Sequence, residues 1–450
     1  MDALFFKLYA ALMWLAQPLL RRKLARRALK EPGYGHAIGE RFGHYTQPPE
    51  PRPKLVWVHA VSLGETRTAA ILLDALRAAH PGLRVLLTHG TATGRAEGAG
   101  LLQPGDVQVW QPWDSPAAVA RFFRHFQPRL GVLMETEVWP CTVAAARQRG
   151  VPLVLANARL SDKSLQQALR LSPLALPAYA ALTAVLAQTE ADAARFAQLG
   201  VPAQVVGNLK FDATPSAEQL ASGRAWRQAV GQPVVMLASS REGEEQLFLE
   251  TFHALARAKH SGNAIDSVAN TQPCRWLLVP RHPQRFDEVA ALALQHGLTV
   301  SRRSDWPAAG PAASPEAMAA NLWLGDSLRE MPLYYALADV ALLGGSFAPL
   351  GGQNLIEAAA CACPVVMGPH TFNFADAATQ AEAAGAAQRA PDMAAGLALA
   401  LQWADDPAAQ ANAAAAGTAF AARNRGATAR TVAALCTLTD SPQTTATGQC

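Results

Sequence analysis

The sequence predicts two Rossmann-like, doubly wound α/β domains that face one another across a cleft. Three observations predict this class. The 450 residues exceed what one ordinary hydrophobic core can organise, so two or more domains are expected. Short apolar runs alternate with longer stretches of helical character, as they do in doubly wound units. The runs are almost continuously apolar, which is typical of parallel strands that helices cover on both faces.

The composition indicates a folded chain with no broad affinity for nucleic acid. Half of the residues are hydrophobic and only 16% are charged, which is the balance of a globular protein. A net charge of +4 is too small to suggest nucleic-acid binding by the whole molecule. The six cysteines form no CxxC pair and have no histidine at zinc spacing, so we interpret them as thiols in a reducing compartment.

The N-terminus differs in character from the rest of the chain. Residues 4–20 are apolar apart from Lys7 and Gln17, and six basic residues follow within residues 21–30. Seventeen helical residues reach about 25 Å, near the lower limit for crossing a bilayer. Because the charge follows the apolar run and no small-residue cleavage site is visible, we predict that residues 1–30 are a retained membrane anchor with a basic flank on the cytoplasmic side. A helix buried against a domain is the alternative, and the sequence does not distinguish a spanning anchor from an interfacial one.

The apolar runs divide the remaining chain into two domains. The predicted parts are a first domain at 31–211, a linker at 212–232, a second domain at 233–438 and a disordered Thr/Gln-rich tail at 439–450. Two polar inserts, 261–273 and 304–320, are interpreted as surface loops. The predicted strands cover residues 55–59, 84–88, 107–110, 130–134, 152–156, 183–187 and 204–206 in the first domain, and 234–238, 275–279, 321–324, 339–343 and 364–367 in the second.

Glu65 is the first candidate for a functional residue. Ligands of such sheets bind beyond the carboxyl ends of the strands, and Glu65 follows the first strand at the start of a helix-like run. Ser62 and Glu65 match a capping box, in which both side chains satisfy free backbone donors. However, Gly64 is a poor residue within a first helical turn, and no hydrophobic staple is present. We therefore predict that Glu65 is a general base that takes a proton from a substrate hydroxyl.

Further charged residues follow the later strands of the first domain. Glu135 and Glu137 could grip acceptor hydroxyls or steer a base, or they could be first-turn acids favoured by the dipole of the next helix. We favour a functional role, more for Glu135 than for Glu137. Arg159 could meet an anionic substrate or pair with a nearby acid, and Lys210 closes the domain. No metal is expected, because no DxD motif, His–carboxylate cluster or third ligand at useful spacing occurs.

The second domain contains the pattern of a nucleotide site. Arg281 leaves a strand directly after Pro280, and its planar guanidinium suits a phosphate, with a structural ion pair as the alternative. Gly351 and Gly352 lead into a helix that Asn354 would cap. A glycine-rich approach followed by free helix N–H groups can bind a phosphate, and it could also be a flexible loop before a capped helix.

Glu357 lies one turn inside that helix, where it could accept hydrogen bonds from ribose hydroxyls. The stretch is neither a Walker A loop nor a GxGxxG fingerprint. Residues 239–245 and 325–330 also follow strands and could either contact a nucleotide through the backbone or cap helices, and residues 368–374 are expected to complete the rim of the site. The further candidates for substrate contacts are Arg159, Lys210, Arg241, Gly351, Gly352 and His370.

The motifs resemble, in order, those of the 3-deoxy-D-manno-octulosonic acid (Kdo) transferase family of lipopolysaccharide biosynthesis. The matching stretches are HAVSLGE (59–65), METEVWP (134–140), NARLS (157–161), GNLKFD (207–212), REGEE (241–245), VPRHP (279–283), GGSF (344–347), GGQNLIEAAA (351–360) and MGPHTFNF (367–374). The resemblance runs from the N-terminus to about residue 376.

The resemblance implies a membrane-associated glycosyltransferase of the GT-B fold on the cytoplasmic face of the bacterial inner membrane. It implies transfer of Kdo from CMP-Kdo to the lipid A precursor, lipid IVA, with inversion and without cofactor or metal. The first domain would then bind the acceptor and the second the CMP-sugar. Glu65 matches the family's proposed base and Glu135 a second acid on the acceptor side.

The CMP-binding segments of the family match Pro280, Arg281, Leu328, Arg329, Glu330, Asn354, Leu355, Ile356 and Glu357. One position departs from the pattern, since Arg329 stands where the family usually has glycine. Two other functions stay open on the residues alone. One is a different GT-B enzyme that uses a UDP-sugar, either a transferase or a sugar-nucleotide epimerase, and the other is a non-catalytic nucleotide-binding membrane protein.

Overall fold

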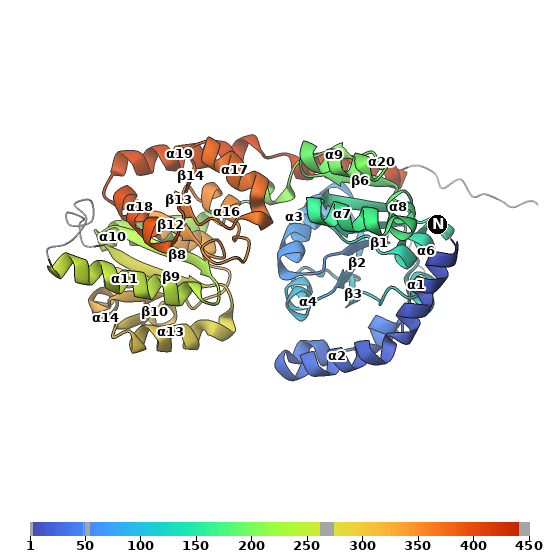
Figure 1. The fold of residues 1–450 in the computed structure, drawn as a ribbon, viewed down its shortest axis with the longest axis horizontal. Coiled ribbons are helices and arrows are strands. Elements are labelled where there is room, and N and C mark those ends of the chain that lie inside the picture. The colour runs from blue at the N-terminus through green and yellow to red at the C-terminus, as the bar shows by residue number, and fades with distance from the viewer. Residues whose placement is uncertain (1–2, 48, 50–54, 262–273, 441–450) are drawn as a thin grey trace, which may run out of the picture. The chain divides into compact units, whose positions relative to one another are not determined.

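The computed structural model describes residues 3–47, 49, 55–261 and 274–440 (Figure 1). The chain forms two compact units. Unit 1 comprises Met1–Asp212 and Arg425–Cys450, and unit 2 comprises Ala213–Asn424. Residues 1–30 therefore belong to unit 1, and residues 425–438, which the sequence assigned to the second domain, return to the first.

Unit 1 is built on a seven-stranded parallel sheet (Figure 1). Its strands are β1 (Leu55–His59), β2 (Arg84–His89), β3 (Val107–Trp110), β4 (Leu130–Met134), β5 (Leu153–Ala158), β6 (Ala184–Ala187) and β7 (Gln204–Val205). The spatial order is β3-β2-β1-β4-β5-β6-β7, so the direction of winding reverses between β1 and β4. In an open α/β sheet this switch point is where a ligand crevice forms, beyond the carboxyl ends of the strands.

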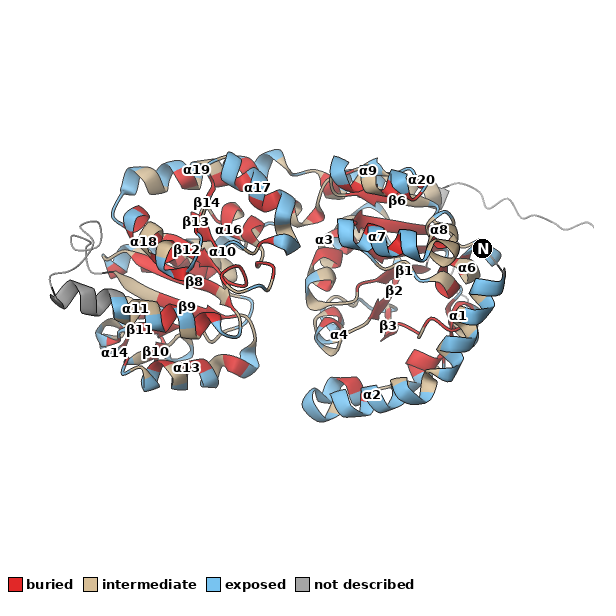
Figure 2. Cartoon of the chain, in the orientation of Figure 1, coloured by how far each residue is buried: buried red, intermediate tan, exposed pale blue. Residues whose placement is uncertain are grey.

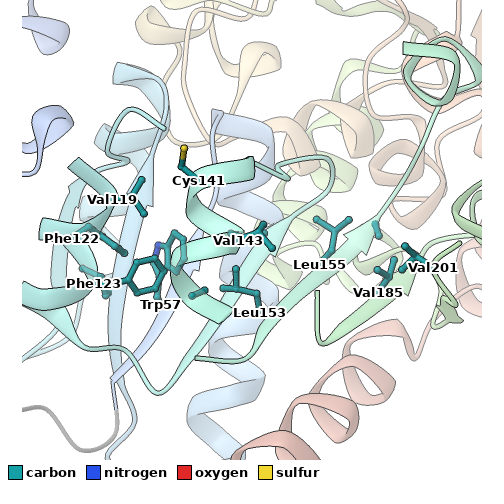
Figure 3. Packing of buried hydrophobic residues seen from close by; sticks show 14 of the residues in the cluster. Trp57, Val119, Phe122, Phe123, Cys141, Val143, Leu153, Leu155, Val185 and Val201 are labelled. Atoms are coloured by element: carbon teal, nitrogen blue, oxygen red, sulfur yellow. The ribbon is translucent and has the colours of Figure 1, made fainter. Parts of the chain in front are cut away.

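Helices cover the sheet of unit 1, whose two faces carry separate hydrophobic clusters. The helices are α1 (Ala3–Leu15), α2 (Gln17–Lys30), α3 (Leu63–Ala79), α4 (Ala92–Ala99), α5 (Pro116–Phe126), α6 (Pro140–Gln148), α7 (Asp162–Arg170), α8 (Ser172–Tyr179), α9 (Glu190–Gln198) and α20 (Ala427–Asp440). Trp57 packs on Phe122 and Phe123 in one cluster, with ring centroids 5.0 and 5.7 Å away (Figure 3). Val58, the next residue of β1, lies in the other cluster, because successive side chains of a strand point to opposite faces.

Unit 2 repeats the architecture. Its strands are β8 (Val234–Ser240), β9 (Arg275–Pro280), β10 (Val300–Arg302), β11 (Leu322–Leu324), β12 (Val340–Leu343), β13 (Val365–Met367) and β14 (Ala387–Arg389). Its helices are α10 (Ala217–Val230), α11 (Glu244–Ser261), α13 (Phe286–Gln295), α14 (Pro315–Ala319), α15 (Met331–Leu337), α16 (Leu355–Ala360), α17 (Ala375–Ala383), α18 (Met393–Ala404) and α19 (Pro407–Arg423). The strand order β10-β11-β9-β8-β12-β13-β14 puts the switch point between β8 and β12.

The two parallel-sheet domains confirm the predicted fold class, and most predicted strands lie within two residues of their observed bounds. The edge strands β10 and β14 were not predicted. Each has three residues, and neither carries a continuous apolar run, so the sequence signal for them is weak.

The stretch predicted as a linker is largely helical and belongs to unit 2. Trp226 of α10 is buried against Trp306, with ring centroids 6.0 Å apart, and Trp306 packs in turn on Trp323 at 5.3 Å. The insert at 304–320 is therefore anchored to the core and contains α14, which corrects its interpretation as a plain surface loop. The other insert, at 262–273, lies outside the described residues.

The apolar N-terminus is two helices rather than one. Helix α1 ends at Leu15, and α2 begins at Gln17 with Pro18 in its first turn, where a residue without an N–H is tolerated. Among the described residues, no helix is long and apolar enough to cross a membrane, so a spanning anchor is not supported. Phe6 and Tyr9 pack against the core of unit 1. The opposite face of α1 exposes leucines, and α2 is exposed along most of its length (Figure 2).

The segment from residue 425 to residue 440 packs on unit 1. Helix α20 lies against α3, and Asp212 accepts hydrogen bonds from the N–H groups of Gly426 (2.6 Å) and Thr428 (2.6 Å). The predicted disordered tail begins at residue 439, but α20 extends to Asp440, and residues 441–450 lie outside the described part of the chain.

Candidate active site

Glu65 lies in the first turn of α3, beside the switch point of unit 1. The capping box forms, because the Glu65 N–H donates to Ser62 Oγ at 3.4 Å and Ser62 Oγ donates to Glu65 Oε1 at 3.1 Å. The N–H of Val61 donates to Oε2 at 2.8 Å. These bonds fix the carboxylate beyond the carboxyl end of β1. The capping role and a role as a base are therefore compatible at this residue.

The surroundings of Glu65 favour its protonated form. Burial raises its pKa, and the negative charge of Glu135 raises it further, so the pKa reaches about 7 in place of its ordinary 4.5. A carboxylate whose pKa lies near neutrality can accept a proton from a hydroxyl and release it again under physiological conditions. The sequence could not predict this pKa, because the pKa depends on the burial of Glu65 and on the charge of Glu135, which follows a different strand.

Glu135 follows β4, on the other side of the same switch point. It is buried, and its φ of +57° is a left-handed conformation that non-glycine residues seldom adopt. Lys210 Nζ donates to its Oε1 at 2.8 Å, and Arg159 Nε donates to its Oε2 at 3.0 Å. Burial opposes ionisation, but the two cations outweigh it and hold the pKa of Glu135 below its usual value. The structure thus joins three residues that the sequence singled out separately.

A second acid lies in the loop of residues 135–139, which we call the acceptor loop after the role predicted for it from the sequence. Glu137 accepts a hydrogen bond from Trp139 Nε1 at 2.7 Å, and burial raises its pKa. Its Oε2 lies 3.9 Å from Nε2 of His59, a buried histidine that sequence inspection missed. Burial lowers the pKa of His59 to about 3, so this ring is neutral. The half-exposed indole of Trp139 leaves an apolar surface beside the acids.

In unit 2, Arg281 lies among other basic groups. Its N–H donates to the carbonyl of Ser240 at 3.0 Å, which ties the end of β9 to the end of β8. Burial lowers the pKa of His282, and the charges of Arg241 and Arg281 lower it further. Arg241 donates to Glu242 at 3.2 Å. Arg241 and Arg281 therefore both place positive charge near His282, beyond the carboxyl edge of the sheet.

Hydrogen bonds within the protein hold the glycine-rich loop, residues 344–352. The Glu244 carboxylate accepts from the N–H groups of Gly345 (2.6 Å), Phe347 (3.0 Å) and Ala348 (3.3 Å). The Gly352 N–H donates to the Gly345 carbonyl at 2.7 Å. These loop N–H groups are therefore engaged within the protein. The predicted phosphate site uses the helix N–H groups at the start of α16, which these bonds do not involve, so it stays a prediction.

Glu244 was missed as an organising residue of this loop. It is fully buried, and the sequence indicated for its REGEE stretch only a helix cap or a backbone contact to a nucleotide. Gly351 and Gly352 have φ values of +92° and +76°, and a Cβ at Gly351 would lie 2.3 Å from Asn373 Nδ2. Glycine is required there by the backbone and by the close approach of the chain. The backbone N–H of His370 donates to Ser346 at 3.0 Å at the same rim.

The helix after this loop carries the remaining predicted nucleotide residues. Asn354 caps α16, accepting from the Ile356 N–H at 3.2 Å. Leu355 and Ile356 are buried, so a ligand could meet only their backbone. Glu357 and Arg281 both act electrostatically on Tyr335, whose pKa burial raises. Arg281 and Glu357 therefore both lie within electrostatic reach of Tyr335, although they follow different strands.

Arg329, which departs from the family pattern, lies in the 328–330 loop at a position with an unusual backbone conformation. Arg329 has a φ of +65°, the conformation that favours glycine, and its carbonyl accepts from Gln219 Nε2 at 2.9 Å. Glu330 is held by Arg303 at 3.0 Å, and Leu328 is exposed. Pro280 is buried at the end of β9.

Within the described residues, no three His, Cys, Asp or Glu side chains are grouped so that they could hold a metal ion.

A family model described as 3-Deoxy-D-manno-octulosonic-acid transferase (kdotransferase) matches residues 36–213. A 3-deoxy-D-manno-octulosonic acid transferase of Bordetella pertussis is 49% identical over 426 residues, which cover 93% of this chain and 96% of the relative. That of Haemophilus influenzae is 31% identical over 373 residues, covering 81% and 82%.

Two solved structures share the fold. A glycosyltransferase from Rickettsia africae ESF-5 matches with a TM-score of 0.56 and 11% identity, over 87% of this chain and all of that one. Anabaena HepE in complex with UDP and glucose matches with a TM-score of 0.54 and 16% identity, over 85% and 99%. At such identities these likenesses concern the two-domain GT-B architecture alone.

Proposed function

Because this chain belongs to the family of 3-deoxy-D-manno-octulosonic acid transferases, and is therefore a glycosyltransferase of Kdo, we propose that it transfers Kdo from CMP-Kdo to the lipid A precursor, lipid IVA, in lipopolysaccharide core synthesis. The observation that carries the mechanism is the position of Glu65. Its carboxylate is fixed beyond β1 at the switch point of unit 1, and its pKa is raised to about 7 by burial and by Glu135.

In the proposed step, Glu65 accepts the proton of an acceptor hydroxyl as the oxygen attacks the anomeric carbon of Kdo. The bond from that carbon to the phosphate of CMP breaks on the opposite face, so the configuration inverts. CMP leaves with the electron pair, and because its phosphate is a good leaving group, no general acid is required. One carboxylate then suffices, where a glycosidase needs two. General-base assistance of this kind contributes about 10²–10⁴-fold.

The residues of unit 2 would bind the donor. Arg281 and Arg241 supply positive charge for the phosphate, which gains charge as the bond breaks. Asn354 and Glu357 lie at the start of α16, where the carboxylate could accept from ribose hydroxyls. The proposed reaction uses no cofactor and no metal ion.

On the acceptor side, we propose that Glu135 acts through its charge. Its two oxygens are occupied by Lys210 and Arg159, so it keeps a negative charge beside Glu65 and maintains the basicity of that carboxylate. Lys210 and Arg159 also supply donors that an acceptor phosphate or hydroxyl could meet. His370, Gly351 and Gly352 belong to the rim of the donor site.

The N-terminal helices suit a lipid surface in the interfacial position. Leu4, Leu8, Leu12 and Leu15 of α1 are each more than half exposed and share one face of the helix. Next to them, a hollow of about 650 Å³ along α2 is lined by Leu19, Arg22, Lys23, Arg26, Arg27, Lys30 and Glu31. An apolar stripe followed by cations is the pattern of a helix that lies in an anionic membrane interface. We propose that the protein is held in this way on the cytoplasmic face of the bacterial inner membrane.

The test is mass spectrometry of the lipid formed from lipid IVA and CMP-Kdo. We expect an added mass of one or more Kdo residues with the wild-type protein, and about 10²–10⁴-fold slower formation of this product with Glu65→Gln. Product from UDP-sugars in place of CMP-Kdo would favour another GT-B activity, and nucleotide binding without product would favour a non-catalytic protein. In the same preparation, Arg281→Ala should weaken CMP binding, and unchanged affinity would contradict its phosphate role.

A further inference from the structure

A buried hydrogen-bonded link joins helix α1 to the helix that follows the acceptor loop. Tyr9 Oη donates to Asp114 Oδ2 at 3.0 Å, across 105 positions of the sequence. Asp114 is buried, and it lies in the connection between β3 and α5. Burial raises the pKa of Tyr9, and the charge of Asp114 raises it further, so the phenol remains a hydrogen-bond donor.

The Asp114 carboxylate also accepts hydrogen bonds from the start of α6. Its Oδ2 accepts from the Cys141 N–H at 2.9 Å, and its Oδ1 accepts from the N–H and the hydroxyl of Thr142 at 2.8 and 2.7 Å. The N-cap of α6 is Trp139, which makes no capping bond of its own. Asp114 therefore supplies, from another segment, the cap that α6 lacks.

The position of α6 sets the position of the acceptor loop. The loop is five residues long and is held at one end by β4 and at the other by α6. It carries Glu135 and Glu137, the two acids whose charges raise the pKa of Glu65. Any shift of the first turn of α6 moves Glu137 and Trp139 directly.

We infer that Tyr9 and Asp114 are positioning residues of the acceptor site, which connect α1 to the acceptor loop. This inference rests on the proposed function of that loop. The leucine stripe is on the exposed side of α1, so the same helix that we propose meets the lipid surface also supports the loop that we propose receives a lipid acceptor. Seating α1 on the membrane would then stabilise the geometry required for transfer.

The experiment compares Tyr9→Phe with Tyr45→Phe. Both changes remove one hydroxyl from a tyrosine packed on the same cluster, but the Tyr45 hydroxyl is buried without a hydrogen-bond partner among the described residues. With lipid IVA in anionic vesicles, Tyr9→Phe should raise the acceptor KM by about three- to tenfold, the range expected for one lost hydrogen bond of ordinary strength. The KM of CMP-Kdo should not change, and Tyr45→Phe should match the wild type in both constants.

Two readouts separate positioning from simple stabilisation. Displacement of Glu137 should move the acidic limb of the pH profile of Tyr9→Phe to lower pH, because Glu65 loses a neighbouring charge. Thr142→Val removes a hydroxyl bond at the other end of the link, and it should reproduce the acceptor effect without touching α1. In the double variant the effects should not multiply, since both act through Asp114.

A lowered Tm with unchanged acceptor KM and unchanged pH profile in Tyr9→Phe would overturn the inference. So would full multiplication of the two effects in the double variant. Failure of the proposed function itself would be seen earlier, as absence of Kdo product from the wild-type protein.

Discussion

Burial and, after it, the negative charge of Glu135 raise the pKa of Glu65 to about 7. The two residues follow β1 and β4, the strands on either side of the switch point of unit 1. Glu135 can exert this effect because Lys210 and Arg159 keep it ionised in a buried position. One ion-paired carboxylate thereby tunes another.

The pH dependence of transfer should report this pairing. A base works only when deprotonated, so kcat/KM should rise with pH through about 7. Glu65→Gln keeps an oxygen that can accept from the Val61 N–H but cannot take a proton, and it should lower kcat by about 10²–10⁴-fold. Steady-state kinetics between pH 5 and 9 provide the measurement. An acidic limb near 4.5, or a Gln variant with wild-type kcat, would contradict the assignment.

The same substitution should stabilise the fold in a pH-dependent manner. The pKa of Glu65 is higher in the folded state than its ordinary value, so its contribution to stability is present below about pH 4.5 and is lost as pH rises through about 7. Glu65→Gln should therefore raise the free energy of unfolding by about 1–3 kcal/mol at pH 8 and by little at pH 5. Urea unfolding at both pH values tests this. An equal effect at both pH values would show that folding does not raise the pKa of Glu65.

The Lys210–Glu135 ion pair should stabilise unit 1 with the opposite pH trend. Lys210→Met leaves Glu135 buried with Arg159 as its remaining ion-pair partner, and it should cost about 1–3 kcal/mol at pH 7. The pKa of Glu135 is depressed in the fold, so the stability it contributes is present at neutral pH and is lost as pH falls. The deficit should shrink toward pH 4. Lys163→Met, on an exposed position of α7, is the matched control and should have almost no effect.

Glu244 should be essential to the glycine-rich loop of unit 2. Glu244→Ala leaves four backbone N–H groups, two of them buried, without their acceptor and should cost about 2–4 kcal/mol. It should also weaken CMP binding, because α16 follows this loop. Glu242→Ala, two residues away and exposed, should change stability by less than about 0.5 kcal/mol. Thermal unfolding and CMP titration of both variants make the comparison, and equal effects would exclude the loop-holding role.

The sequence predicted the two sheets because their central strands are continuous apolar runs, as in Leu130–Met134. It predicted Glu65 and Glu135 because both follow strands. It could not predict that Lys210 donates a hydrogen bond to Glu135, since 75 residues separate them and they follow β7 and β4, which are not neighbours in the sheet. The N-terminus was predicted as one anchor because hydropathy averages over the break before Pro18, and α20 was assigned to the wrong domain because helical periodicity does not identify the surface on which a helix packs.

Arg329 offers a test of backbone strain at a position where the family usually has glycine. The left-handed φ of Arg329 costs a non-glycine residue about 1–2 kcal/mol, and glycine avoids this cost. Glycine also loses more conformational entropy on folding, which offsets part of the stabilisation. Arg329→Gly should therefore raise the free energy of unfolding by about 0.5–1 kcal/mol. Arg329→Ala removes the same charged side chain but keeps the strain, so it should bring no such gain. Thermal unfolding of the two variants separates conformation from charge, and an equal Tm for both would mean that the positive φ is not a source of strain in this loop.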